Sequence, residues 1–189
     1  LDALLTVRLP AGTTFDLDGE PLTIGAGMNV TLEGDGEVGA TLDAANRSSV
    51  LVVERGGQAV LRRLHLVRGR ATGGDYGGCV RVAGDAADST RLTVEDSTIS
   101  ECAAERGGGF AVSGGLLVVR RSVVARCNAE SSEGVATGGG LYVFGMADVA
   151  MYDSAITDCA ASSEFGAYGG GVYVYGGTVM LANMIIANA

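Results

Sequence analysis

Short segments of the chain alternate hydrophobic and polar residues with a period of two, a pattern that predicts half-buried β-strands. Between residues 141 and 157 the positions expected to point inward are Leu141, Val143, Val149, Met151 and Ile156. Those expected to point outward are Tyr142, Phe144, Ala150 and Thr157. A helical period does not compete with this alternation, so the sequence predicts an all-β protein.

Glycine-rich turns divide the strands into repeats. The turns begin at residues 77, 107, 138 and 169, and the apolar residues that follow them are Val80, Phe110, Leu141 and Val172. A constant interval of about 30 residues is typical of stacked supersecondary units, so each repeat should form one coil of a solenoid. Three short strands are expected in each coil. Residues 48–189 carry the regular pattern, whereas residues 1–47 are less regular and read as the opening coils of the same domain.

Aligning the coils places charged residues in vertical columns. One column contains Arg62, Glu95, Arg120 and Tyr152, a second Arg63, Asp96, Arg121 and Asp153, and a third Arg68, Glu101, Arg126 and Asp158. Stacked coils bring equivalent residues within about 4.8 Å, so this order lets each arginine meet a carboxylate above or below it. The columns are therefore interpreted as a structural device that fixes the register.

Cysteines also follow the repeat. Cys102, Cys127 and Cys159 share one inward column, and Cys79 replaces the third glycine of its turn. We expect the three column cysteines to be buried, adjacent and mostly reduced, because small thiols fill cores well. A disulfide between Cys102 and Cys127, or between Cys127 and Cys159, is the less favoured alternative. The spacing does not match a zinc site.

The glycine turn and the segment S-x-[IV]-x-x-C together resemble a known family. The clearest segments are 107–110 with 124–127, and 138–141 with 156–159. They are similar to the GGA-[ILV] and F-x-x-N repeats of polymorphic outer-membrane and adhesin-type proteins, which have the pectin-lyase-like fold. The resemblance implies a right-handed parallel β-helix solenoid. It implies no activity, because this fold carries enzymes, adhesins and spacers.

Composition narrows the range of functions. The formal net charge is −9 and all 13 basic residues are arginines, which argues against a nucleic-acid partner. No apolar stretch is long enough for a membrane helix, so no membrane span is expected. The family resemblance favours an extracellular or cell-surface location, with an organelle lumen as the alternative.

Enzymatic chemistry has weak support in the sequence. The outer columns of the first sheet contain no carboxylate; they read Leu51, Arg81, Ala111, Tyr142, Tyr173 and Val53, Ala83, Ser113, Phe144, Tyr175. The single histidine, His65, falls in an outward column that offers no acid to orient it. Two acidic groups, Asp85 with Asp88 and Asp16 with Asp18 and Glu20, supply fewer oxygens than calcium prefers. We therefore expect no catalytic residues, no metal and no cofactor.

Aromatic residues supply the candidate binding site: Tyr142, Phe144, Tyr173 and Tyr175. They fall on neighbouring outward positions of the last two coils, with Phe165 and Tyr168 in the adjoining loop. Stacking up the β-ladder, a protein-binding patch and a carbohydrate platform are the three interpretations left open. The sequence stops inside a coil, so either more chain or a partner should cover that end.

The sequence thus predicts a non-catalytic structural or interaction module. It should dock another protein or subunit through the outer aromatic face and the C-terminal coil. The alternative is a carbohydrate-active enzyme or carbohydrate-binding module, with polysaccharide as the partner. The sequence also contains two glycosylation sequons, Asn29-Val-Thr31 and Asn46-Arg-Ser48, which matter only in a chain secreted by a eukaryote.

Overall fold

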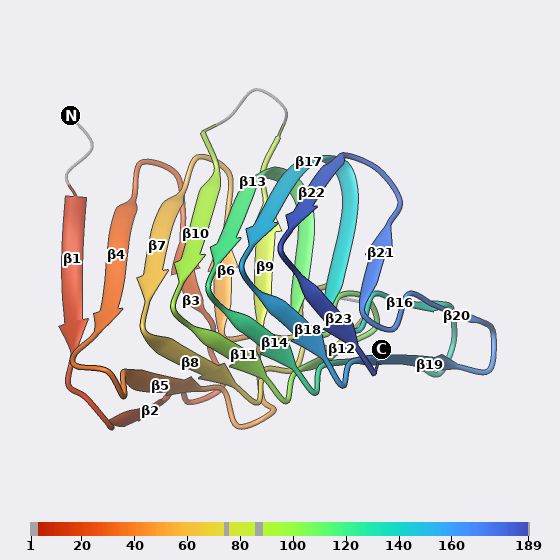
Figure 1. Ribbon diagram of the computed structural model, residues 1–189, viewed down its shortest axis with the longest axis horizontal. Helices are drawn as coiled ribbons and strands as arrows, with labels where there is room; N and C mark the ends of the chain where they lie inside the picture. Colours follow the sequence, from red (N-terminus) through yellow and green to blue (C-terminus); the bar gives the residue numbers. More distant parts are fainter. Residues whose placement is uncertain (1–3, 74–75, 86–88, 189) are drawn as a thin grey trace.

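The protein is a parallel β-solenoid of about six turns (Figure 1). The computed structural model describes residues 4–73, 76–85 and 89–188, and no helix occurs among them. The strands pair in parallel with the equivalent strands of the neighbouring coils, about 30 residues away. The all-β solenoid and its repeat length are therefore as predicted.

The largest sheet contains two rows of strands. The first row comprises β3 (Leu22–Ile24), β6 (Leu51–Val53), β9 (Val80–Ala83) and β21 (Val172–Val174). The second row comprises β1 (Leu4–Leu9), β4 (Asn29–Gly34), β7 (Gln58–Arg62), β10 (Arg91–Glu95) and β22 (Thr178–Ala182). Two long strands, β13 (Phe110–Arg120) and β17 (Leu141–Tyr152), run through both rows and join them.

The other sheets close the coils. The second sheet comprises β2 (Thr14–Asp16), β5 (Ala40–Asp43), β8 (Leu64–Val67), β11 (Thr98–Ser100), β14 (Val123–Ala125), β18 (Ala155–Thr157) and β23 (Ile185–Ala187). Two small sheets comprise β12 (Ala103–Ala104), β15 (Asn128–Ser131) and β19 (Ala160–Ser163), and β16 (Ala136–Thr137) with β20 (Ala167–Tyr168). Figure 1 shows β16, β19 and β20 extending beyond the stack as an arm.

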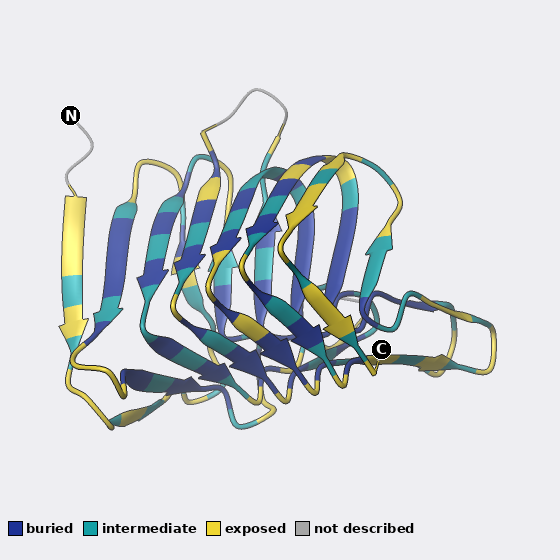
Figure 2. Cartoon of the chain, in the orientation of Figure 1, coloured by how far each residue is buried: buried dark blue, intermediate teal, exposed yellow. Residues whose placement is uncertain are grey.

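The predicted interior stack is confirmed. Phe110 is the register partner of both Val80 and Leu141, and Leu141 is in turn the partner of Val172. The first three of these side chains have no exposed surface, whereas Val172, in the last described coil, is partly exposed. Figure 2 shows the buried middle of the solenoid and its more exposed end strands. Period-two alternation thus identifies the core correctly.

The predicted alignment is wrong by one residue in one early coil. Leu51 pairs with Val80 and Val53 with Val82, so both side chains lie in the core instead of on the outer face. Val52 is the true outer residue and pairs with Arg81. Because successive side chains in a strand point to opposite faces, a one-residue shift exchanges inside and outside.

Buried serines form a hydrogen-bonded ladder at the corner between the two large sheets. The backbone N–H of Ser97 donates to Ser122 Oγ, and that of Ser122 donates to Ser154 Oγ, each at 3.1 Å. Each hydroxyl in turn donates to the carbonyl oxygen two residues earlier. The residue before each serine has a left-handed backbone, with φ of 47–50° at Asp96, Arg121 and Asp153. The serine of the S-x-[IV]-x-x-C motif therefore bridges the coils where the chain turns.

The charge columns form ion pairs, as predicted. Glu95 lies between two arginines, with Oε2 2.9 Å from Arg62 Nε and Oε1 3.4 Å from Arg120 Nη1. Asp96 accepts two hydrogen bonds from Arg121, at 2.7 and 2.9 Å, and these bonds hold the pKa of its carboxyl below the usual value. The same geometry recurs on the other side of the second sheet, where Arg68 makes two hydrogen bonds to Asp43. The pairs join consecutive coils and so stabilise their register.

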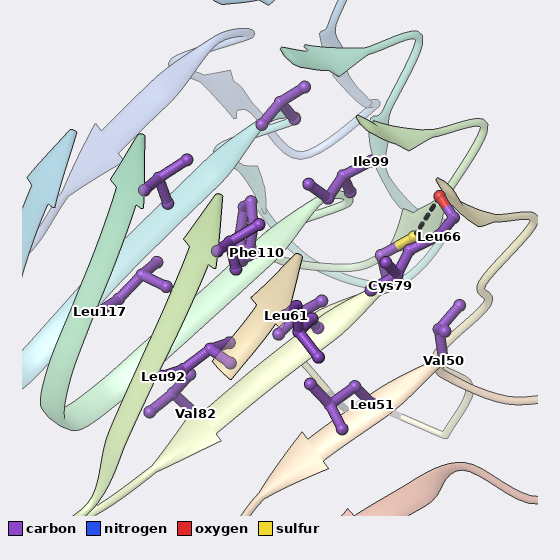
Figure 3. Packing of buried hydrophobic residues seen from close by; sticks show 14 of the residues in the cluster. Val50, Leu51, Leu61, Leu66, Cys79, Val82, Leu92, Ile99, Phe110 and Leu117 are labelled. Atoms are coloured by element: carbon purple, nitrogen blue, oxygen red, sulfur yellow. Dashed lines mark hydrogen bonds between the residues drawn. The ribbon is translucent and has the colours of Figure 1, made fainter. Parts of the chain in front are cut away.

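The cysteine column is only partly as expected. Cys127 and Cys159 are buried free thiols, but Cys102 forms a disulfide with Cys79, with their Cα atoms 5.4 Å apart. The prediction that Cys102 is reduced is wrong, and the bond is neither of the two disulfides considered. Cys79 replaces a glycine immediately before β9, and its buried side chain is bonded to Cys102, which lies immediately before β12. Figure 3 shows Cys79 in the core, with its Sγ atom 3.5 Å from the carbonyl oxygen of Leu66.

Candidate functional site

The predicted aromatic residues come from β17 and from the coil that follows it. Tyr142 and Tyr173 are register partners on the outer face of the first-row strands, and Tyr142 also pairs with Ala111. Their rings are stacked, with centroids 5.9 Å apart and planes inclined by 17°. The ring of Phe144 lies beside that of Tyr142, at 4.8 Å and 20°. The structure thus brings three of the four predicted residues into one cluster.

Two members of this cluster were missed in the sequence. The ring of Tyr76 meets that of Phe144 edge-on, with centroids 5.2 Å apart, and its centroid is 6.0 Å from that of Tyr142. Tyr76 nevertheless lies two coils from both residues. The guanidinium of Arg106 lies over the Tyr76 ring, 5.5 Å from its centroid, and donates a hydrogen bond to the Tyr76 hydroxyl at 3.3 Å. We call Tyr76, Arg106, Tyr142, Phe144, Tyr168 and Tyr173 the aromatic cluster.

A column of equivalent positions in the sequence could have revealed Tyr76 and Arg106. Tyr76, Arg106, Thr137 and Tyr168 each precede a glycine pair, and each pairs with the next across the coils. Parallel partners present their side chains to the same face. This column lies next to the predicted column of Tyr142 and Tyr173. Tyr168 joins the two columns, because its ring centroid is 6.1 Å from that of Tyr173.

The cluster is closed at its centre and open at one side. Tyr142 is only 5% exposed, which contradicts its expected place on an exposed face, and burial raises the pKa of its hydroxyl while Arg106 acts in the opposite direction. Tyr76 covers it from one side and Tyr173 from the other. By contrast, Tyr175 is 77% exposed and Tyr168 is 55% exposed. The most exposed aromatic rings beside the cluster thus lie on its C-terminal side.

A buried hydroxyl lies in the same column. Thr137 is 5% exposed, and its Oγ1 has no hydrogen-bond partner among the described residues. Its neighbours in the column are Arg106 and Tyr168. An unpaired buried hydroxyl reduces stability, because it has lost its hydrogen bonds to water.

Polar grooves flank the cluster. One, of about 330 Å³, lies between the outer faces of β3, β6 and β9 and the loops beside them, and its lining includes Tyr76, Arg47, Arg70, Arg81 and Ser48. A second, of about 210 Å³, is lined by Arg70, Thr72, Glu105, Glu130 and Ser132, among other residues. The two grooves share Arg70, whose Nη2 atom is 3.9 Å from Glu130 Oε2. Hydroxyls, carboxylates and guanidinium groups of this kind can bind the hydroxyl groups of a sugar.

The weaker candidates from the sequence fall elsewhere. His65 lies in its predicted column beside Thr98, and its Nε2 atom is 2.9 Å from the carbonyl oxygen of Val38. Asp16 and Asp18 both pair with Arg47, which neutralises part of their negative charge.

Of the two loop aspartates, the structure describes only Asp85. Asp85 pairs with Arg55 at 3.0 Å, and Asp88 lies outside the described residues. No group of three His, Cys, Asp or Glu residues suited to a metal is found in the part of the chain that the structure describes. Within that same part, no helix is long and apolar enough to cross a membrane.

Comparisons of the chain with protein-family models, with curated proteins and with solved structures found no match. Its function therefore has to be argued from the surface itself.

Proposed function

We propose that the protein is a non-catalytic interaction module that docks another protein or subunit through the C-terminal side of the aromatic cluster. One observation carries the proposal: the stacked rings of Tyr142 and Tyr173 continue to the exposed ring of Tyr168, and Tyr175, two residues after Tyr173, is also exposed. Tyrosine is enriched at protein interfaces because it combines a large apolar area with a hydroxyl that can stay hydrated.

The rigid base of this surface supports the same role. Tyr173 is held by Tyr142 and Tyr168, and Tyr142 is held by Tyr76 and Phe144. Side chains that are already ordered lose less conformational entropy on binding, so they contribute more to affinity. The solenoid thus presents a preorganised aromatic surface.

We place this function outside the cell or at the cell surface, with an organelle lumen as the alternative. The Cys79–Cys102 disulfide supports this placement, because disulfides form and persist in oxidising compartments.

The test measures the complex that the protein forms with its partner from the native source, and compares variants of the protein. The double variant Tyr173→Ala with Tyr175→Ala should lose the partner, measured as a fall in native complex mass by size exclusion with light scattering. Tyr152→Ala is the matched control, because Tyr152 lies outside the cluster beside Arg120. Thermal unfolding of both variants shows whether the fold is kept. An unchanged complex mass in the folded double variant would contradict the proposal.

A carbohydrate-active or carbohydrate-binding role is the second candidate. The adjoining polar grooves favour it, because the Tyr76 ring lines one and the carboxylates Glu105 and Glu130 line the other. Binding of neutral and acidic oligosaccharides by the wild type, lost in Glu130→Gln but kept in the double tyrosine variant, would favour this role over protein docking.

A further inference from the structure

The two glycosylation sequons lie in different environments. Asn46-Arg-Ser48 occupies the corner after β5, whereas Asn29-Val-Thr31 begins strand β4 inside the largest sheet. An asparagine that carries a glycan needs a side chain that reaches solvent and a surrounding surface that leaves room for the sugar.

Asn46 meets both conditions. It is exposed and has a left-handed backbone with φ of 60°, a conformation that asparagine adopts more readily than most residues. Its backbone N–H donates to the carbonyl oxygen of Arg68 at 2.6 Å, so the corner is anchored while the side chain stays free to project. The next residue in the chain, Arg47, is exposed and forms ion pairs with Asp16 and Asp18.

Asn29 meets the same two conditions, solvent access and room for a sugar, poorly. Its register partners are Leu4 in β1 and Gln58 in β7, so its side chain has a neighbouring strand on each side. Asn29 is only partly exposed, whereas Asn46 is exposed. The hydroxyl residue is buried in both sequons, Thr31 in one and Ser48 in the other, so it does not distinguish them. A glycan at this position would have to lie across the outer face of the sheet.

We propose that Asn46, and not Asn29, is an N-glycan acceptor when the chain passes through a eukaryotic secretory pathway. The donor is a lipid-pyrophosphate-linked oligosaccharide. A bond forms between Asn46 Nδ2 and C1 of the first sugar, the bond from C1 to the pyrophosphate oxygen breaks, and the amide loses one proton as the lipid pyrophosphate leaves. Nothing is oxidised or reduced.

The position of the glycan has a consequence for the surface. Arg47 and Ser48 of the sequon line the 330 Å³ groove, so the sugar would stand at the rim of that groove. In the natural source the modification rests on the proposed extracellular location, but the acceptor itself can be tested without any partner.

The experiment is secretion of the full chain from a eukaryotic host, followed by intact mass measurement before and after peptide-N-glycosidase. One removable glycan is expected in the wild type and in Asn29→Asp, and none in Asn46→Asp or Ser48→Ala. Asn46→Asp keeps a residue that tolerates the left-handed backbone, and Ser48→Ala removes the sequon while keeping Asn46. A glycan that persists in Asn46→Asp, or a folded secreted wild type without a removable glycan, overturns the proposal. Neither result affects the test of partner docking, which measures complex mass.

Discussion

Replacing Ser122 with alanine tests whether the serine ladder holds neighbouring coils together. Ser122 is buried, and its hydroxyl accepts the backbone N–H of Ser97 at 3.1 Å while donating to the carbonyl oxygen of Arg120 at 2.8 Å. In Ser122→Ala the N–H of buried Ser97 loses its acceptor, and a methyl group cannot replace it.

The expected loss of unfolding free energy follows from this single unsatisfied donor. Leaving one buried N–H unpaired costs about 1–3 kcal/mol. In a domain of this size, each kcal/mol lowers the melting temperature by about 2–4 °C. The variant should therefore melt about 2–12 °C below the wild type.

Two measurements check this reasoning. Urea unfolding gives the change in free energy, and native-state hydrogen exchange reports on the Ser97 amide itself, which should exchange faster in the variant. Ser132→Ala is the control, because Ser132 is exposed and its hydroxyl can be replaced by water contacts. A stability change below about 0.5 kcal/mol together with a still-protected Ser97 amide would refute the argument, since surface substitutions commonly give changes of that size.

Three further outcomes are expected. Thr137→Val should leave unfolding free energy unchanged or raise it by up to about 1 kcal/mol in urea titrations, because it removes an unpaired buried hydroxyl; clear destabilisation would show that the hydroxyl has a partner. Hydrogen bonds from Arg68 hold the pKa of Asp43 below its ordinary value of about 3.9, so this pair stabilises the fold above that pH and loses its effect as the pH falls through the lowered value. Stability curves between pH 6 and 2 should thus fall more steeply for the wild type than for Asp43→Asn, and parallel curves would contradict this. Cys127 and Cys159 are free thiols buried in the core, so both should react with a bulky disulfide reagent only after unfolding; rapid reaction in the native state would contradict their burial.

The repeat could be predicted because every coil imposes the same physical demands on the same positions. Phe110 and Leu141 align because a turn of fixed length delivers each to the same place in the core. The arginine and carboxylate columns provide an independent check, because their alternation has meaning only if the coils are in register. Where the turn before Leu51 lacks the glycine run, the alignment loses its reference, and the prediction exchanges the inner and outer faces.

The disulfide could not be predicted from that alignment. A column groups residues at equivalent positions of successive coils, and such residues point the same way. Cys79 and Cys102 occupy different positions of the repeat, and they meet because the turn before β9 lies beside the segment that leads into β12. A pattern that compares like positions does not detect a contact between unlike ones.

A contact between unlike positions of the repeat also explains why Tyr142 is buried on the outer surface. Tyr76 reaches Tyr142 over Ala111, a residue too small to separate the two rings, and so the contact skips one coil. The outward alternation at Tyr142 is correct, yet the side chain is buried, because a neighbouring column supplies a cover that the strand pattern does not contain. A residue that faces outward in a β-solenoid is thus exposed only if the adjacent column leaves it uncovered, and this condition separates Tyr142 from Tyr175. The docking proposal accordingly depends on Tyr173 and Tyr175, and substituting Tyr142 would test packing and not recognition.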